Sequence, residues 1–263
     1  LQRGAGFPVK TVGVVPARMA SSRFPGKPLH PICGMPMVEH VFRRASLFQG
    51  WDGLYLATCD KEIAALGRAR GWPTLMTSDR HTRALDRVAE AAATCGRPLE
   101  PDDVVVCVQG DEPMMQPDMI AASIRPLEED ATAGCTVLAM EIADEAVFRN
   151  PDTVKIIHDM KGNVLYTSRA PVPHCKKWPP GPPTPRRIYG IFAFRWHFLQ
   201  TFTSLPESPL ELAESCDSNR IFDHGYRQRI APYPYLPSFS VDSPSDTALV
   251  EQHLLSDPLW GRY

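Results

Sequence analysis

Four short apolar runs recur along the first 140 residues, and between them lie longer stretches in which apolar and polar positions follow helical spacing. The runs lie at 12–15, 54–57, 104–108 and 136–140, and the helical stretches lie at 37–48, 61–70, 85–94 and 117–127. A continuous apolar run is typical of a strand buried on both faces, and its alternation with helices indicates a parallel sheet covered on both sides. The pattern predicts an α/β fold with a Rossmann-like, doubly wound, mostly parallel sheet.

The rhythm changes after residue 150, where shorter strands replace the alternation of strand and helix. Segments 154–158 and 163–166 predict two strands joined by a turn at 159–162, and segment 188–194 predicts another strand, followed by a helix at 196–203. Residues 170–185 are rich in proline, which removes backbone donors and excludes a helix or a central strand. We therefore expect a smaller β-rich part with a long loop.

Composition narrows the class of protein. With 263 residues, 43% of them hydrophobic, the chain can bury one large core. The net charge of −2 gives no general attraction for nucleic acid or a membrane, so neither is an expected partner. No apolar stretch is as long as a membrane span, and the first residues do not resemble a secretory signal. The seven cysteines form no CxxC pair and no metal-ligand spacing, which predicts a protein of the reducing cytoplasm.

A basic loop follows the first apolar run. Within ten residues it contains three cations, two serines and a glycine, namely Arg18, Arg23, Lys27, Ser21, Ser22 and Gly26. α/β sheets place ligands at the C-terminal ends of their strands, and cations, hydroxyls and free backbone N–H groups suit phosphate oxygens. The loop predicts a triphosphate site, with a solvated basic loop as the alternative. No G-x-G-x-x-G follows this strand, which argues against a dinucleotide-dependent dehydrogenase.

Two aspartates are candidate metal ligands. Asp111 follows the run 104–108 and a turn at Gly110, which places it at the same sheet edge as the basic loop. Asp242 lies between segment 235–241 and a helix that begins at 243–246. Two carboxylates from distant parts of the chain suit Mg²⁺, with water and phosphate as the other ligands. A turn role for Asp111 and an N-cap role for Asp242 are the structural alternatives, and we interpret Asp60 as a helix N-cap only.

Several ordered motifs resemble one known family. They are Pro16-Ala17-Arg18, the runs 22–29 and 34–38, Val108-Gln109-Gly110-Asp111-Glu112-Pro113, Val154-Lys155, Tyr166-Thr167-Ser168-Arg169-Ala170 and the run 241–246. In this order and spacing they resemble the cytidylyltransferases that make CMP-activated acid sugars, most closely the enzymes for 3-deoxy-manno-octulosonate (Kdo). The resemblance extends from about residue 11 to about residue 255.

The resemblance implies a nucleotidyltransferase-type fold, Mg²⁺ as cofactor, and transfer of CMP from CTP to an anionic acceptor with release of pyrophosphate. Residues 1–10 would be an N-terminal extension to a single domain at 11–263. In that domain about 11–150 would bind the nucleotide, and about 151–240 would bind the acceptor and form a homodimer contact. Residues 241–263 would return to the metal site and end in a helix.

The resemblance also assigns roles residue by residue. The implied catalytic residues are Arg18, Lys27, Asp111 and Asp242, of which the two aspartates are the metal ligands. The implied nucleotide-binding residues are Pro16, Ala17, Arg18, Ser21, Ser22, Arg23, Lys27, Arg83, Asp86, Arg87, Gln109 and Asp111. The implied acceptor-binding residues are Arg169, Tyr189, Glu211, Asp217 and Ser218.

Three departures from the Kdo pattern bear on the acceptor. Ser-Gly-Thr becomes Arg83-Ala84-Leu85, His-Leu-Gly-Ile-Tyr becomes Ile188-Tyr189-Gly190-Ile191-Phe192, and Leu-Glu-Gln-Leu-Arg becomes Cys216-Asp217-Ser218-Asn219-Arg220. Lost hydrogen-bonding groups change which acceptor a site takes, while Arg169 can still hold an acidic head in a bidentate manner. The hypothesis is therefore a small phosphonate or carboxylic acid as the acceptor. The alternatives are a CMP-Kdo synthetase and a non-catalytic nucleotide-binding paralogue.

Overall fold

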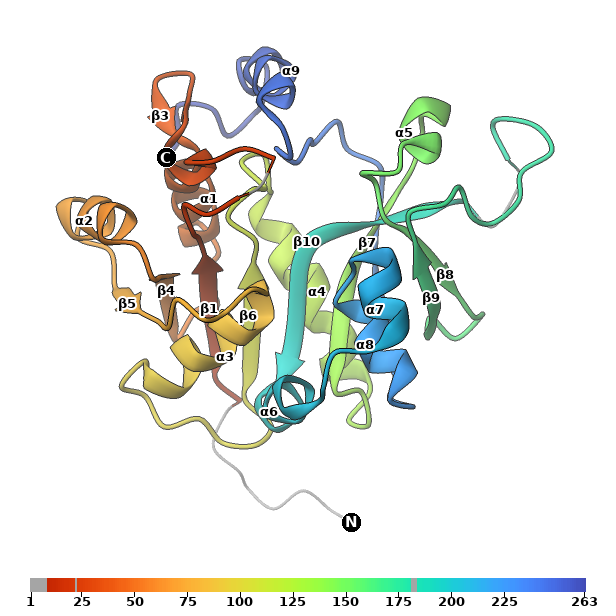
Figure 1. Cartoon of the computed structure of the whole chain (residues 1–263), viewed down its shortest axis with the longest axis horizontal. Coiled ribbons are helices and arrows are strands. Elements are labelled where there is room, and N and C mark those ends of the chain that lie inside the picture. Colours follow the sequence, from red (N-terminus) through yellow and green to blue (C-terminus); the bar gives the residue numbers. More distant parts are fainter. Residues whose placement is uncertain (1–8, 22, 181–183) are drawn as a thin grey trace.

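A sheet of nine strands lies at the centre of the computed structural model, which describes residues 9–21, 23–180 and 184–263 (Figure 1). Seven of the described strands follow one another in the order β11-β7-β10-β6-β1-β4-β5. Their bounds are β11 (Arg229–Tyr233), β7 (Cys135–Glu141), β10 (Arg186–Arg195), β6 (Val104–Val108), β1 (Thr11–Pro16), β4 (Gly53–Thr58) and β5 (Thr74–Met76). β8 (Lys155–His158) pairs with β10 and with β9 (Val164–Ser168) beside this path. The four strands expected in the first 140 residues are all present.

Along the path of seven strands most neighbours are parallel, as the sequence pattern predicts, but β10 runs the other way, and the β8–β9 hairpin beside the path is also antiparallel. β1 runs parallel to β4 and β6, β4 to β5, and β11 to β7. β10 is antiparallel to both β6 and β7, so its arrow points the other way in Figure 1. The chain reaches β10 from the proline-rich loop, which lies at the end of the sheet where the parallel strands finish. β10 therefore runs back in the opposite direction.

Helices cover both faces of the sheet, and each face has its own apolar core. One core contains residues of α1 (Met37–Ser46), α2 (Lys61–Ala69) and α4 (Pro117–Glu129). The other contains residues of α3 (Ala84–Thr94), α6 (Trp196–Ser204) and α8 (Ser218–Asp223). β10 contributes to both cores by alternation, since Tyr189 and Ile191 belong to the first and Phe192 and Phe194 to the second. The doubly wound arrangement is therefore confirmed.

The remaining elements gather near the C-terminal ends of the parallel strands or beside the hairpin. They are η1 (Lys27–Leu29), β2 (Pro31–Ile32), β3 (Met35–Pro36), α5 (Glu145–Arg149), α7 (Pro209–Glu214) and α9 (Pro244–Leu254). The described part of 170–185 contains no helix or strand, as its prolines predict, and it projects beside α5 in Figure 1. The hairpin, the helix after β10 and the helix that begins at 244 are also confirmed.

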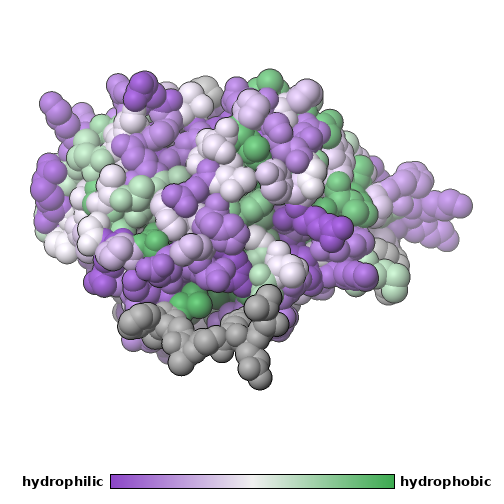
Figure 2. Space-filling view, turned by 90° about the horizontal axis from the view of Figure 1, so that it is seen from below, coloured by the Kyte–Doolittle hydropathy of each residue, from purple (hydrophilic) through white to green (hydrophobic). Residues whose placement is uncertain are grey.

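The surface fits the modest net charge. Figure 2 shows hydrophilic and hydrophobic residues intermingled on the face seen from below, which lies opposite the C-terminal ends of the parallel strands. All seven cysteines are free thiols, and Cys107 and Cys135 are buried in strands as small apolar residues. Across the described residues we find no helix that is both long and apolar enough to cross a membrane.

Candidate active site

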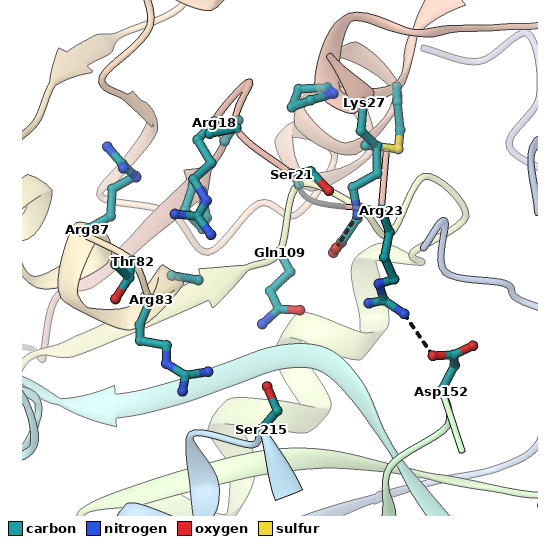
Figure 3. A pocket seen from close by; sticks show the side chains of 18 of the residues that line it. Arg18, Ser21, Arg23, Lys27, Thr82, Arg83, Arg87, Gln109, Asp152 and Ser215 are labelled. Carbon is teal, nitrogen blue, oxygen red and sulfur yellow. Dashed lines mark hydrogen bonds and ion pairs between the residues drawn. The ribbon is translucent and has the colours of Figure 1, made fainter. Parts of the chain in front are cut away.

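A cavity of about 640 Å³ opens where β1 and β6 end, as in other open α/β sheets. Arg18, Arg83, Gln109 and Lys27 extend into it from three separate segments (Figure 3). We refer to it as the basic cavity. Its lining includes most of the predicted nucleotide-binding residues, namely Pro16, Ala17, Arg18, Ser21, Arg23, Lys27, Arg83, Arg87, Gln109 and Asp111. The prediction for Ser22 lies outside the described residues.

The basic loop is fixed by backbone hydrogen bonds to its neighbours. The Met19 N–H donates to the Asp60 carboxylate at 2.7 Å, and the Gly26 N–H donates to the Met19 carbonyl at 3.0 Å. Gly26 has a φ of +76°, a left-handed conformation that favours glycine. Asp60 does occupy the N-cap position of α2, but its side chain makes no cap bond there. The interpretation of Asp60 as a cap only was wrong, because the carboxylate is used to anchor the loop.

The three cations of the loop differ in their partners. Arg18 donates only a long hydrogen bond of 3.4 Å to the His81 carbonyl among the described contacts. Arg23 forms ion pairs of 2.7 Å with both Asp152 and Asp242. Lys27 forms an ion pair of 2.9 Å with Asp111 and donates to the Val241 carbonyl at 2.7 Å. Two cations are therefore tied to carboxylates, while Arg18 remains directed at the cavity.

The structure brings the two predicted metal ligands together. The Val241 N–H donates to the main-chain carbonyl of Asp111 at 3.0 Å, which joins the segment before Asp242 to the end of β6. Gly110 permits the end of β6 to approach the end of β1, because a Cβ there would lie 2.7 Å from the Pro16 carbonyl oxygen. Burial raises the pKa of Asp242, and the charge of Asp111 raises it further. Two carboxylates that repel each other beside the basic cavity are a suitable pair of ligands for a hard divalent cation.

The turn before α3 supplies further cations. Arg87 is buried, and its guanidinium donates to the Thr77 hydroxyl and to the Ser78 and His81 carbonyls while lining the basic cavity. Asp86, which was predicted to bind nucleotide, does not line this cavity. Its carboxylate lies 4.0 Å from the Arg220 guanidinium, and burial raises its pKa. The helical spacing turns Asp86 away from the face that bears Arg83 and Arg87.

A second cavity of about 440 Å³ adjoins the first. We refer to it as the acceptor-side cavity. Five residues line both cavities and mark the junction between them, namely Gln109, Asp111, Asp152, Arg169 and Ser215. Of the predicted acceptor-binding residues, Arg169 and Asp217 line this cavity. Arg83 and Asp217 face each other across 3.4 Å, and each lines a different cavity.

Three of the predicted acceptor-binding residues are not in the acceptor-side cavity. Tyr189 is fully buried in the core, and its hydroxyl shares a hydrogen bond of 2.6 Å with the Ser238 hydroxyl. Glu211 is also fully buried and accepts from the Arg220 guanidinium at 2.6 and 2.8 Å. Ser218 is buried at the start of α8. Strand alternation directs Tyr189 inward and an internal ion pair holds Glu211, so the structure places these side chains away from the cavity, and their contact with an acceptor stays a prediction.

Glu112, a carboxylate in the lining of the acceptor-side cavity, had no predicted role. Glu112 is buried, lines the cavity, and accepts from the Gly190 N–H at 2.9 Å and from the Ser240 hydroxyl at 2.8 Å. Burial raises its pKa to about 7, and the charge of Asp111 adds to the rise. A Cβ at Gly190 would lie only 2.8 Å from the carboxylate. The signal was present in the motif 108–113, where a glutamate directly follows the metal-ligand candidate.

Comparison with known proteins identifies the family. A family model described as cytidylyltransferase matches residues 12–230. This span includes the basic loop, Asp111 and Arg169, and it covers most of the chain. The protein belongs to the cytidylyltransferase family and is therefore a nucleotidyltransferase.

Curated relatives narrow the comparison to one activity. A 3-deoxy-manno-octulosonate cytidylyltransferase of Syntrophus aciditrophicus is 38% identical over 246 residues, which cover 94% of this chain and 98% of the relative. The corresponding enzyme of Oleidesulfovibrio alaskensis is 40% identical over 238 residues, which cover 90% and 94% of the two chains. The resemblance given by the motifs is confirmed.

Solved structures agree on the fold. A CMP:2-keto-3-deoxy-manno-octonic acid synthetase complexed with CTP superimposes with a TM-score of 0.83 at 31% identity, over 94% of this chain and 99% of that one. A 4-diphosphocytidyl-2C-methyl-D-erythritol synthase superimposes with a TM-score of 0.62 at 13% identity, over 95% of this chain and 100% of that one. The second likeness shows the fold alone.

Proposed function

We propose that this protein transfers CMP from CTP to 3-deoxy-manno-octulosonate and releases pyrophosphate, as a CMP-Kdo synthetase. The observation that carries the proposal is the junction of the two cavities, where Asp111 and Arg169 line both the basic cavity and the acceptor-side cavity, and Lys27 in the basic cavity pairs with Asp111. Such an arrangement suits a reaction that joins a triphosphate to an acid. The relatives named above supply the identity of both substrates for the proposal.

The choice of Kdo replaces the small-acid acceptor favoured by the sequence. Ile188 and Phe192 do line the acceptor-side cavity, and this observation keeps a compact acid as the second candidate. The same cavity, however, also contains polar groups of Gln109, Arg187 and Asp217 that can pair with sugar hydroxyls. Kdo enzymes at 38–40% identity over nearly the whole chain favour the sugar acid.

The proposed reaction needs little covalent chemistry from the protein. An acceptor hydroxyl oxygen forms a bond to the α-phosphorus and releases its proton to water, the bond from that phosphorus to the bridging oxygen breaks, and pyrophosphate leaves. Arg18 and Lys27 would stabilise the negative charge that develops on the leaving pyrophosphate. Arg169, at the junction, would hold the acceptor's carboxylate in a bidentate manner.

Mg²⁺ is part of the proposal. Asp111 and Asp242 would hold it, because their carboxylates are hard oxygen donors that lie close enough for the charge of Asp111 to add to the effect of burial in raising the pKa of Asp242. Within the described residues no group of three or more acidic, histidine or cysteine side chains is placed to hold a metal, so phosphate oxygens and water would complete the coordination. When bound, the cation would polarise the phosphates and neutralise their charge.

The test of function is pyrophosphate release with each of the four nucleoside triphosphates against Kdo, other acid sugars, phosphonates and short carboxylates. We expect CTP and Kdo to give the highest kcat/KM. Release with a small acid but not with Kdo would replace the proposal with the second candidate. Absence of pyrophosphate release with every pair would favour a nucleotide-binding paralogue.

Asp111→Asn tests the metal assignment. We expect at least about a hundredfold loss in kcat, because the amide removes a charged ligand while keeping its shape. Thermal unfolding should remain that of the wild type, and Asp79→Asn in an exposed turn is the matched control. Activity within about tenfold of the wild type, roughly 1.4 kcal/mol of barrier, would contradict the assignment.

Location in the reducing cytoplasm also remains a proposal. It is supported by seven cysteines that all remain free thiols, since structural disulfides are the rule only in oxidising compartments.

A further inference from the structure

Lys155 is a buried lysine that the proposed reaction does not use directly. It lies at the start of β8 and has no solvent exposure. Its ammonium group donates to three main-chain carbonyls, at 2.9 Å to Asn150, 2.5 Å to Thr153 and 2.6 Å to Arg169. A buried ammonium is costly unless its donors are satisfied, and here three carbonyls fulfil that need. An apolar residue would fill the space without this cost, so the charge calls for a functional reason.

The three carbonyls belong to two of the segments that line the junction of the cavities. One is segment 150–153, which contains Asp152, a partner of Arg23. The other is the end of β9, which continues into Arg169. The Arg169 guanidinium returns to the first segment, because it donates to the Pro151 carbonyl at 2.9 Å. Lys155 therefore joins the two segments on their buried side, and Arg169 joins them on the side that faces the cavities.

The charges around this pair do not balance. The Arg169 guanidinium donates to the carbonyls of Pro151, Glu214 and Ser215. The Glu214 carboxylate at the end of α7 is the acidic group that faces both Lys155 and Arg169. It accepts hydrogen bonds from the main-chain N–H of Arg169 and from the Tyr166 and Ser168 hydroxyls. The Asp152 carboxylate is bound by Arg23. Two cations thus share one carboxylate, which leaves positive charge at the junction where an anion would bind.

We propose that Lys155 is a positioning residue for the acceptor, which holds the Arg169 segment against segment 150–153 and adds positive charge beneath the place where the acceptor's carboxylate binds. The proposal rests on the proposed function, because it assumes an acidic acceptor on Arg169. Lys155 itself lines neither cavity, so it acts through Arg169 and not by contact with the substrate.

The protonation of Lys155 makes the idea testable without a mutation. Burial lowers the pKa of Lys155 to about 8, the charge of Arg169 lowers it further, and Glu214 opposes the shift. Above pH 8 the lysine therefore loses its charge and one of its three hydrogen bonds. We expect the KM of the wild type for the acceptor to rise between pH 7.5 and pH 9.5, while the KM for CTP stays nearly constant.

Lys155→Met is the decisive variant, with Lys161→Met as its matched control. Lys161 lies exposed in the turn of the same hairpin. At pH 7.5 we expect K155M to raise the KM for the acceptor about tenfold, equivalent to about 1.4 kcal/mol, with little change in kcat or in the KM for CTP. K161M should match the wild type. In K155M the KM for the acceptor should no longer depend on pH between 7.5 and 9.5.

The outcomes separate this inference from the proposed function. A wild type that turns over Kdo and CTP, with K155M equal to K161M in acceptor KM, would overturn the role of Lys155 and leave the function intact. A wild type inactive with Kdo would contradict the proposed function, and the same comparison would then use the best acid of the panel. If K155M failed to fold, a wild-type acceptor KM that stayed constant from pH 7.5 to 9.5 would overturn the proposal.

Discussion

Arg18 and Lys27 bring the same charge to the basic cavity but have different neighbours. Lys27 bridges Asp111 and the Val241 carbonyl, whereas the hydrogen bond of Arg18 to a described residue is a long one of 3.4 Å to the His81 carbonyl. We expect Arg18→Ala and Lys27→Ala each to lower kcat/KM for CTP about a hundredfold, because both act on the leaving pyrophosphate. Only K27A should also raise the Mg²⁺ concentration needed for half-maximal rate, because it disturbs the two aspartates.

Steady-state kinetics at varied CTP and Mg²⁺ provide the measurement, and Lys61→Ala on the exposed start of α2 is the control. An equal shift of the Mg²⁺ requirement in R18A would show that the two cations are not distinguished by their partners. A change confined to the KM for the acceptor would show that the basic loop binds the acceptor and not CTP.

The protonation of Asp217 affects the free energy of unfolding. Burial raises its pKa from 3.8 to about 6, and Arg83 opposes the shift. In this window the folded state binds more protons than the unfolded state, so the contribution of Asp217 to stability is complete below about pH 4 and is lost as the pH rises through 6. We expect the free energy of unfolding of the wild type, relative to Asp217→Asn, to decrease from pH 4 to pH 6.5. Urea unfolding across this range is the measurement, and the exposed Glu129→Gln is the control. A difference in free energy of unfolding between the wild type and D217N that stays constant with pH would contradict the prediction.

The helices α7 and α8 depend on one buried ion pair. Glu211 in α7 is fully buried and contacts the Arg220 guanidinium of α8 with both carboxylate oxygens. Breaking a buried pair leaves an uncompensated charge, so we expect Glu211→Gln to lower the free energy of unfolding by about 3–5 kcal/mol. Denaturant unfolding measures this, and Glu207→Gln on the exposed loop before α7 should change it little. A stable E211Q with a raised acceptor KM would instead support direct contact with the acceptor.

Elements near the site are joined by side chains that sequence periodicity does not reveal. Asp60 at the start of α2 holds the loop after β1, and Glu112 after β6 holds both β10 and the segment before Asp242. Each of these carboxylates follows a parallel strand, so each reaches across the same sheet edge. The segments that line the site are therefore positioned by polar contacts between loops as well as by an apolar cluster that contains Phe24, Met114 and Val241.

At the scale of the whole molecule, we propose a homodimer formed through the β8–β9 hairpin. β9 pairs with β8 on one edge, and its other edge is already bonded, because the Val164 N–H donates to the Gln228 carbonyl at 2.8 Å and the Thr167 N–H donates to the Asn219 side chain at 3.3 Å. Leu165 in β9 is 57% exposed, and Met160 in the hairpin turn is fully exposed. These exposed apolar side chains, and not an open strand edge, make the hairpin a favourable surface for a second copy.

Sedimentation equilibrium tests the dimer. We expect the wild type to sediment as a dimer and Leu165→Lys to shift it toward the monomer, because the charge would be buried at the interface. Met76→Lys is the matched control, since Met76 is 51% exposed at β5 on the far edge of the sheet. A monomeric wild type would contradict the proposal, and dissociation by M76K alone would move the interface to the other edge.

The sequence by itself determined the doubly wound α/β fold, because apolar runs and helical spacing are local patterns that bury both faces of a sheet. It also predicted that the loops after the runs at 12–15 and 104–108 lie at one edge of the sheet, and the structure places Arg18, Lys27 and Asp111 of these loops in one cavity. The antiparallel direction of β10 was not part of that prediction, because strand direction depends on how distant segments pair.

Only the tertiary structure decided which polar residues face a cavity and which are held inside. Tyr189 and Glu211 lie in segments that align with the family motifs, yet strand alternation directs the first into the interior and a partner nine residues away holds the second there. Glu112 and Lys155 lie within recognised motifs, but their roles depend on donors and carbonyls contributed by other segments. A side chain's neighbours across the fold are set by packing and by the need to satisfy every buried polar group, and neither is encoded in local spacing.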